Sequence, residues 1–449
     1  MRISVTKPLF AWECLEDGPS LATLKQLLAA IPDQRLLESL RRARGKGRAD
    51  YPVQTLWGVL LLSIACRHPS MEACLEELRR NAGLRALIGI PSEHKVPKAW
   101  NMSRFMDTLG MEPHLTLLKE AFNAMIQRLG EVVPDLGKDT AGDATALNAR
   151  RKPEDKAQQE AGLPQATGGR KEYTNDEGMV TRVVEWFGYK LHLLVDVKHE
   201  VALSYEVTDT KAGDGETLPT LLKQGQANLP EDRIESVAYD KAADTNEVHQ
   251  LLSDEGIKPV IQNRALWKED HERMLPGHDG NSNIVYDEAG TVYCYDRESQ
   301  PIVRRQMAYI GYEPERETIK YRCPAMHEGF PCAMSPICNA GKSYGKTVRV
   351  PREIEPRRFP ALPRATQKFE RMYKGRTSVE RVNGRFKIFW GVDDGNITGA
   401  QRFFAHVGAV MAVHAAFATV LAATPRREGT LGKMRLSPIA QTLREKLAV

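Results

Sequence analysis

Three acidic residues lie where strands or a helix could present them to a ligand. Asp143 lies within a predicted strand, Asp139 to Leu147, and Asp240 directly follows the short apolar run Ile234 to Tyr239. Carboxylates at strand ends in an α/β sheet face the crevice in which ligands bind. Each of these two residues, taken alone, is explained equally well as a helix cap or a surface charge.

The third acidic residue, Glu380, shares one face of a predicted helix with Tyr373, Arg376 and Lys387. At about 100° per residue, the four side chains project within about 60° of one another. A carboxylate between two cations can bind a metal ion while the cations hold phosphates. An exposed helix with favourable ion pairs explains the same charges, but it does not explain the tyrosine.

Three carboxylates without a Lys or His nucleophile indicate divalent-metal phosphoryl chemistry. Two Mg²⁺ ions, or Mn²⁺, about 4 Å apart activate a water or a 3'-hydroxyl and stabilise the leaving oxygen of an in-line displacement. We therefore predict two hard cations at one site.

Positive charge is concentrated in one segment of the chain. Residues 342–387 contain fourteen Lys or Arg and four Glu, whereas the whole chain has a net charge of only +5. A charge run is often a solvated face. A run this dense next to predicted metal ligands favours nucleic acid as the partner, because each neutralised phosphate releases counterions.

The elements that must position these residues fall into two parts that differ in their pattern of apolar residues. The 449 residues are 42% hydrophobic and 27% charged, which describes a soluble globular protein of two or three domains. Residues 1–131 show helical spacing broken by prolines, and include a buried helix, Tyr51 to Cys66, and an amphipathic helix, Met71 to Asn81. This part is predicted to be an all-helical domain.

From residue 132 to 423 the pattern becomes that of an α/β domain with a mixed sheet. Residues 148–178 are predicted to form a mobile loop, and about 262–362 an inserted subdomain. Helical sequence resumes near Thr366 and runs to Trp390, and residues 424–449 are a basic tail. The predicted strands and helices of the sheet region are Asp139–Leu147, Tyr189–Asp196, Val201–Val207, Glu216–Gln226, Ile234–Tyr239, Asn246–Glu255 and Lys258–Ile261.

An apolar stretch of membrane-spanning length, Phe403 to Ala423, follows a capping-box spacing between Thr398 and Gln401. It contains His406 and His414 and owes much of its apolarity to Ala and Gly. We therefore predict a buried core helix rather than a membrane span.

The chain contains seven cysteines, an odd number that favours a reducing cytoplasm over a disulfide scaffold. The first twenty residues do not resemble a signal peptide. Within the predicted insertion, Cys294, Cys323, Cys332 and Cys338, with His327 among them, are candidate Zn²⁺ ligands. Free buried thiols remain the alternative, since the spacing is not that of a CxxC pair.

The spacing Tyr373-x2-Arg376-x3-Glu380-x6-Lys387 resembles the third acidic signature of bacterial insertion-sequence transposases of the DDE type. Tyr239-Asp240-Lys241 followed by Asp244 resembles their second motif. Gly142-Asp143-Ala144-Thr145 resembles the first, and Phe187-Gly188-Tyr189-Lys190 the strand after it. The helical stretch Tyr51 to Asp107 is similar to the domain that precedes the catalytic core in this family, so the resemblance extends from about Tyr51 to Phe417.

This resemblance implies an RNase H-like catalytic core, interrupted by an insertion before the glutamate helix. It implies that Asp143, Asp240 and Glu380 form the metal triad and that Tyr373, Arg376 and Lys387 contact the transposon end. Asp139 is the alternative for the first motif. We prefer Asp143 because Ala144 and Thr145 follow it, as in the family pattern.

The predicted function is that of a DNA transposase that cuts at the ends of its own insertion sequence and joins them to target DNA. Its partners would be double-stranded DNA and, in the DNA complex, a second copy of the chain, with no membrane involved. The expected location is the cytoplasm, at the nucleoid when DNA is bound. An RNase H-like nuclease without strand transfer, and an inactive DNA-binding protein derived from a transposase, are the alternatives.

Overall fold

The computed structural model describes residues 19–45, 50–150, 162–175, 179–268, 272–275, 283–393, 397–423 and 431. Two predictions for the ends of the chain, a start that does not resemble a signal peptide and a basic tail, fall on residues outside these ranges, except for Pro19, Ser20 and Leu431. Part of the loop predicted at 148–178, namely residues 151–161 and 176–178, is also outside them.

The N-terminal part is helical, as its apolar spacing predicted. α3 is buried along almost its whole length, and the side chain of Ser70 caps the start of α4 by accepting a hydrogen bond from the Ala73 N–H. The helices are α1 (Pro19–Ala30), α2 (Gln34–Arg44), α3 (Val53–Ala65), α4 (Met71–Arg80), α5 (Ala82–Leu87), α6 (Ala99–Leu109) and α7 (His114–Val132), with a 3₁₀ turn η2 (Glu93–Lys95).

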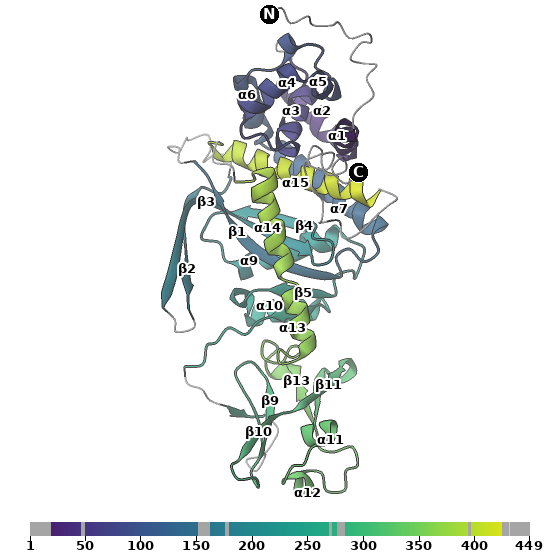
Figure 1. Ribbon diagram of the computed structural model, residues 1–449, viewed down its shortest axis with the longest axis vertical. Coiled ribbons are helices and arrows are strands. Elements are labelled where there is room, and N and C mark those ends of the chain that lie inside the picture. The colour runs from purple at the N-terminus through teal and green to yellow at the C-terminus, as the bar shows by residue number, and fades with distance from the viewer. Residues whose placement is uncertain are drawn as a thin grey trace, which may run out of the picture.

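A six-stranded mixed sheet forms the centre of the molecule (Figure 1). The strand order is β2-β3-β1-β5-β6, and β4 pairs with β3. β1 is antiparallel to β3 and parallel to β5, and β5 is parallel to β6. The strands are β1 (Asp139–Asn148), β2 (Thr167–Thr174), β3 (Val180–Asp196), β4 (Ala202–Thr208), β5 (Ser236–Tyr239) and β6 (Lys258–Ile261). This is the mixed α/β core that the sequence predicted.

The loop prediction for residues 148–178 was wrong over part of its length. β2 pairs with the first half of β3 in a hairpin that projects from the sheet (Figure 1). Most hairpin residues stay exposed, so the alternation of apolar and polar residues that marks a half-buried strand is missing. Gly169 allows the Trp186 ring to lie against the β2 backbone, because a Cβ there would come within 2.4 Å of that ring.

Helix α15 (Ala400–Ala422) lies between the helical region and the sheet (Figure 1). It packs against α7, α6, α1 and α3. By length and composition alone it could cross a membrane, yet 78% of its most apolar window is buried within the protein. The core-helix interpretation therefore fits. The predicted capping box is wrong, because the N-cap is Gly399 and no side chain caps the helix.

The remaining core helices flank the sheet, and the helix predicted over Thr366 to Trp390 is in fact two. α13 ends at Lys374 and α14 begins at Thr377. Between them the N–H groups of Gly375 and Arg376 bond three residues back, to Met372 and Tyr373. Gly375 lies close to Val197, where a Cβ would come within 2.9 Å of a methyl group. These elements are α9 (Asp214–Ala227), η3 (Lys241–Ala243), α10 (Asn246–Asp254), α13 (Gln367–Lys374) and α14 (Thr377–Trp390).

The segment between β6 and α13, predicted as an insertion, contains two small antiparallel sheets with a hydrophobic core of their own. It lies at the end of the molecule opposite the N-terminal helices (Figure 1). Its elements are β7 (Arg273–Met274), β8 (Ile284–Tyr286), β9 (Val292–Asp296), β10 (Val303–Gln306), β11 (Ala308–Glu313), η4 (Pro314–Arg316), β12 (Thr318–Arg322), α11 (Pro324–Glu328), α12 (Ser335–Cys338), β13 (Thr347–Pro351) and η5 (Arg352–Ile354).

Candidate active site

The parallel pairing of β1 and β5 sets Asp143 and Asp240 at the same level of the sheet. Ala141 pairs with Ala238, and each aspartate lies two residues further along its strand direction. Neighbouring strands are about 5 Å apart, so the two residues are neighbours across the sheet. Asp139, the first residue of β1, instead accepts a hydrogen bond from the Ser236 hydroxyl at 2.6 Å.

A glycine and a tyrosine make this close approach sterically feasible. The Tyr239 ring covers Gly142, where a Cβ would come within 2.1 Å of the ring carbon Cε2. Tyr239 is fully buried. Gly142 and Tyr239, the residues that precede the two aspartates, therefore depend on each other. The Tyr239 ring on β5 lies against the backbone of β1, and only a glycine at position 142 leaves room for it.

Arg376 links Glu380, the third carboxylate, to Asp143, the first. Its guanidinium lies 2.7 Å from Glu380 and 3.8 Å from Asp143, joining the start of α14 to β1. Burial alone would lower the pKa of Arg376, but Asp143, Tyr373, Glu380 and Asp240 together raise it. The negative charges of all three predicted triad residues thus act on one guanidinium.

The side chain of Asp143 is only 18% exposed, and burial raises its pKa to about 6. The nearby Arg376 acts in the opposite direction and favours the ionised form. Asp240 is partly exposed and begins the turn η3, where its side chain accepts a hydrogen bond from the Ala242 N–H at 2.8 Å. Glu380 is half exposed, on the first turn of α14.

The other two residues of the third motif lie on either side of this group. Tyr373 is partly buried at the end of α13, its ring stacked on Phe369 with 5.9 Å between centroids and 6.0 Å from the Arg376 guanidinium. Lys387 donates a hydrogen bond to the Ala146 carbonyl of β1 and lies 3.4 Å from Asp393. Tyr373, Arg376 and Glu380 therefore lie together, whereas Lys387 contacts the backbone further along β1.

Sequence reasoning missed the residue that anchors α14 beside the sheet. Glu200, in the turn between β3 and β4, pairs with both Arg381 and Arg385 of α14. Its side chain is 11% exposed. Glu200 has a positive φ of 53°, which only the folded turn reveals. An isolated glutamate in a turn gives no sequence signal of this role.

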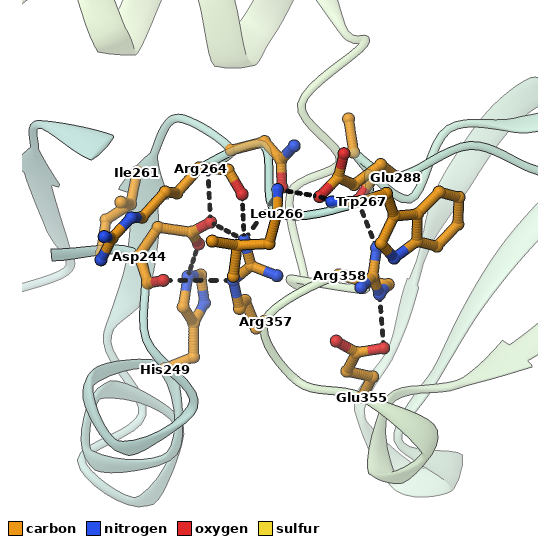
Figure 2. A network of polar contacts seen from close by, with 12 residues as sticks. Asp244, His249, Ile261, Arg264, Leu266, Trp267, Glu288, Glu355, Arg357 and Arg358 are labelled. Atoms are coloured by element: carbon orange, nitrogen blue, oxygen red, sulfur yellow. Dashed lines mark hydrogen bonds and ion pairs between the residues drawn. The ribbon is translucent and has the colours of Figure 1, made fainter. Parts of the chain in front are cut away.

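Asp244, the last residue of the second motif, forms a buried ionic network (Figure 2). Its carboxylate lies 2.8 Å from Arg357, 2.8 Å from Arg364 and 2.9 Å from His249, and accepts the Arg264 N–H at 2.7 Å. Burial by itself would raise the pKa of Asp244. The hydrogen bond from His249 and the charge of Arg364 outweigh this effect, so the pKa of Asp244 lies below its usual value and the carboxylate is ionised.

This network connects the site to the insertion. Arg264 lies just after β6, where the insertion begins, and Arg357 and Arg364 lie where it ends. Asp244 is four residues from Asp240. A single fully buried carboxylate therefore holds both ends of the insertion next to the turn that carries Asp240.

Carboxylate oxygens are hard ligands of the kind that Mg²⁺ and Mn²⁺ prefer, so the triad fits such ions by its chemistry. Throughout the described part of the chain, no three His, Cys, Asp or Glu side chains are grouped closely enough to hold a metal ion. In the triad, Arg376 lies between Asp143 and Glu380.

The four cysteines of the insertion line one shared cavity of about 20 Å³, between β9, α11 and α12. Burial raises the pKa of the Cys294 thiol to about 12, and the other three thiols raise it as well. His327 does not line this cavity. The structure therefore brings together the four cysteines that the sequence singled out.

Comparison with known families identifies the two parts of the chain. The transposase DDE domain family matches residues 138–415, which contain the sheet, the insertion and α14. A second transposase domain family (DUF772) matches residues 14–108, in the helical region. No curated protein matches the chain. The match over residues 138–415 covers more than half of the sequence, and the chain therefore belongs to the transposase DDE domain family of insertion-sequence transposases.

Proposed function

We propose that this transposase cleaves DNA at the ends of its insertion sequence and joins the freed 3'-hydroxyl to target DNA, in a reaction that needs divalent metal ions. One observation carries the proposal: the Arg376 guanidinium lies close to both Asp143 and Glu380, and Asp240 directly follows the neighbouring strand β5. These carboxylates come from three separate parts of the chain: Asp143 lies within β1, Asp240 directly follows β5, and Glu380 is in the first turn of α14.

In this proposal Asp143, Asp240 and Glu380 hold two Mg²⁺ or Mn²⁺ ions. When bound, such ions activate the attacking oxygen and stabilise the leaving oxygen of a phosphodiester. Arg376 competes with the ions for the oxygens of Asp143 and Glu380. With the ions bound, the Arg376 guanidinium would be available to bind a phosphate of the DNA, and the Tyr373 ring lies 6.0 Å from it.

Lys387 and Tyr373 complete the proposed contacts with the transposon end. Lys387 lies on the same helix as Glu380, two turns further along, where its ammonium group can reach a neighbouring phosphate. Double-stranded DNA of the transposon ends and of the target is the proposed substrate. A complex with two DNA ends requires two copies of the chain, and the reaction takes place in the cytoplasm, at the nucleoid.

The division of the chain follows from the same proposal. Residues 1–131 bind DNA, residues 132–423 catalyse, with the insertion at about 262–362, and residues 424–449 form a basic tail. The helical region carries several arginines on α2, of which Arg41, Arg42 and Arg44 lie in its last turn. These cations suit a surface that contacts the DNA backbone.

A strand-transfer assay tests the reaction. The purified protein is incubated with a labelled DNA end, a plasmid target and Mg²⁺. Label joined to the plasmid supports a transposase, and cleavage without joining supports the nuclease alternative. If neither product forms, the chain is a DNA-binding protein without catalysis.

A matched pair of variants tests the site. Glu380→Gln removes a triad carboxylate and should abolish cleavage, whereas Glu370→Gln, on the exposed side of α13, should leave it intact. Full cleavage by the Glu380 variant would overturn the site assignment. Separate alanine substitutions at Asp143 and Asp139 decide the first motif in the same assay: loss of cleavage is expected only at Asp143.

We also propose that Cys294, Cys323, Cys332 and Cys338 bind one structural Zn²⁺. The four thiols line a cavity that is large enough for about one water-sized sphere. Among the described residues of the insertion, ten form its hydrophobic core, and small cores of this kind gain stability from a metal ion. Binding requires the four sulfur atoms to close around that cavity.

Metal analysis of the purified protein tests this site. About one zinc per chain is expected, and Cys323→Ser together with Cys338→Ser should remove it. Cys66→Ser, outside the insertion, is the matched control and should retain zinc. Protein without stoichiometric zinc would discard the proposal.

A further inference from the structure

A groove of about 650 Å³ lies in the helical region, between the end of α2, the start of α3 and one face of α6. The buried side chains that line it include Leu40, Leu56 and Phe105, and the more exposed ones include Arg44, Trp100 and Arg104. The groove therefore has an apolar floor and a rim that carries an aromatic ring and cations.

The spacing of residues along α6 explains why one face of this helix is open to the groove. Trp100, Arg104 and Thr108 follow one another at intervals of four residues, so they lie on one side of the helix, and all three line the groove. Met102 and Met106 project from the other side and are buried. α6 therefore packs on the protein through one face and leaves the other for the groove.

Trp100 is 56% exposed, although apolar side chains form the floor of the groove beside it. Of the five tryptophans that the structure describes, the other four are buried or partly buried. A single exposed apolar residue is common on a protein surface. This ring, however, lies at the edge of a groove and one helical turn from the exposed Arg104, and such pairs of Trp and Arg dominate many binding surfaces.

Cations lie on both sides of the groove. Arg41 and Arg44 are in the last turn of α2, and Arg104 is exposed on α6. Arg41 donates to the Gln54 side-chain oxygen at 3.3 Å, a neutral partner that does not cancel its charge. Among the described residues that line the groove, Asp50 is the single acid. The groove is therefore complementary in charge to an anionic partner.

A strand of duplex DNA matches this combination of groups. Guanidinium groups bind phosphate oxygens and release counterions, and an indole packs its apolar face against a sugar or a base. An acidic peptide would pair with the same arginines, but the chain belongs to a transposase family, for which DNA is the partner.

We propose that the groove between α2 and α6 binds one strand of the transposon-end duplex, with Trp100 packed against a deoxyribose and Arg104 on a phosphate. This inference rests on the proposed function and names the surface through which residues 1–131 bind DNA. The helical region lies on the other side of α15 from the sheet (Figure 1). The contact therefore holds the DNA at a distance from the triad carboxylates rather than at the cleaved phosphodiester.

The experiment measures binding of the full-length protein to a fluorescein-labelled duplex from the end of its element, by fluorescence anisotropy in EDTA. EDTA removes divalent ions, so the result does not depend on the proposed metal site. Trp100→Ala should weaken binding at least about tenfold, because it removes an aromatic anchor. Met111→Ala, at a half-exposed apolar residue outside the groove, is the control and should change binding by less than about twofold.

The salt dependence of binding separates the phosphate contact from the aromatic one. Arg104→Gln should reduce the slope of log K against log salt concentration by about 0.9, the value for one phosphate of B-DNA. Trp100→Ala should leave this slope unchanged, because an indole neutralises no phosphate. Arg128→Gln removes the same charge from the exposed surface of α7, and it should leave both the slope and the affinity near those of the wild type.

Acrylamide quenching of tryptophan fluorescence locates the contact. The difference between the wild type and Trp100→Phe gives the signal of Trp100, which should become less accessible to acrylamide when the duplex is added. Protection that instead appears without DNA, as the protein concentration rises, would assign the groove to a second copy of the chain and overturn the inference.

Thermal unfolding shows whether each variant folds, and Trp100→Gln provides a second substitution if Trp100→Ala does not. Wild-type affinity and slope in folded Trp100 and Arg104 variants overturn the inference, as does a wild-type protein that binds no duplex. If both variants behave as expected while the wild type neither cuts nor joins DNA with Mg²⁺, the DNA-binding groove stands and the proposed reaction fails.

Discussion

The described part of the chain has two hydrophobic cores of very different construction. The larger core is continuous from the N-terminal helices through α15 to the sheet, and consists of aliphatic and aromatic side chains. In the insertion, ten of the residues that the structure describes form a small core, from Leu275 to Phe359. Around it, cations lie on aromatic rings: Arg273 and Arg358 on Trp267, and Arg304 on Tyr293.

This difference shows two ways of stabilising a fold in one chain. The larger core buries many apolar side chains, so its stability is spread over many small contributions. The insertion depends on a few specific contacts and on the buried Asp244 network that attaches it to the site. Substitutions in the two regions should therefore have different effects.

The largest effect is expected for Asp244→Ala. This change leaves Arg357 and Arg364 buried without their carboxylate, and breaking such a pair costs about 3–5 kcal/mol. Urea unfolding should show the loss, and limited proteolysis should show that cleavage within 262–362 increases first. Asp254→Ala, exposed at the end of α10, is the control. A loss below about 1 kcal/mol would mean that the network does not couple the two regions.

A smaller loss is expected for Gly142→Ala in the larger core. The new methyl group would overlap the Tyr239 ring, and overpacking of this kind costs about 1–3 kcal/mol. Gly384→Ala is a control of opposite sign: that site in α14 is open, and alanine there should add about 1 kcal/mol. Equal stabilities of the two variants would contradict the observed packing of Tyr239 on Gly142.

The pH dependence of stability provides a third test of the larger core. His414 in α15 is buried, accepts the Ala202 N–H at 3.0 Å, and has its pKa lowered by burial from 6.5 to about 3. Because the unfolded chain binds a proton below pH 6.5 and the native chain does not, stability should fall as the pH drops from 6.5 toward 3.

His414→Gln should reduce this fall between pH 6.5 and 4, by up to about 1.4 kcal/mol per pH unit, as measured by urea unfolding at each pH. Burial also lowers the pKa of His192, so this residue likewise reduces stability as the pH falls, and part of the slope remains in the His414 variant. The exposed His94→Gln is the control. An unchanged slope in the His414 variant would show that this imidazole is not the titrating group.

The smallest effect is expected for Tyr344→Leu in the insertion. The Arg322 guanidinium lies 4.0 Å from the centre of this half-exposed ring. Cation–π contacts at exposed sites contribute about 0.5–1 kcal/mol. A loss above about 2 kcal/mol in urea unfolding would mean that single surface contacts matter more in the insertion than this comparison assumes.

The sequence predicted those elements whose burial repeats with a regular period. Alternation in Tyr189–Asp196 and the apolar run before Asp240 identified β3 and β5, and the buried helices α3 and α15 followed from their unbroken apolar stretches. The family resemblance, confirmed by the matches over residues 14–108 and 138–415, provided the RNase H-like core.

Other features have no local signal. The exposed β2–β3 hairpin lacks alternation, and the break at Gly375 depends on its contact with Val197 across the fold. Glu200 is a single acidic residue whose partners are distant in sequence. The triad itself was predicted from spacing and resemblance. The position of Arg376 between Asp143 and Glu380 could be seen only in the structure.

Helix α15 is synthesised after every other described helix and strand except the single turn at Leu431, yet it fills the space between the N-terminal helices and the sheet. During translation, the apolar surfaces of the N-terminal helices and of the sheet that α15 covers therefore stay exposed until α15 has been synthesised. A transcript interrupted before Ala400 would yield a chain that exposes both surfaces, a natural target for chaperones and proteases.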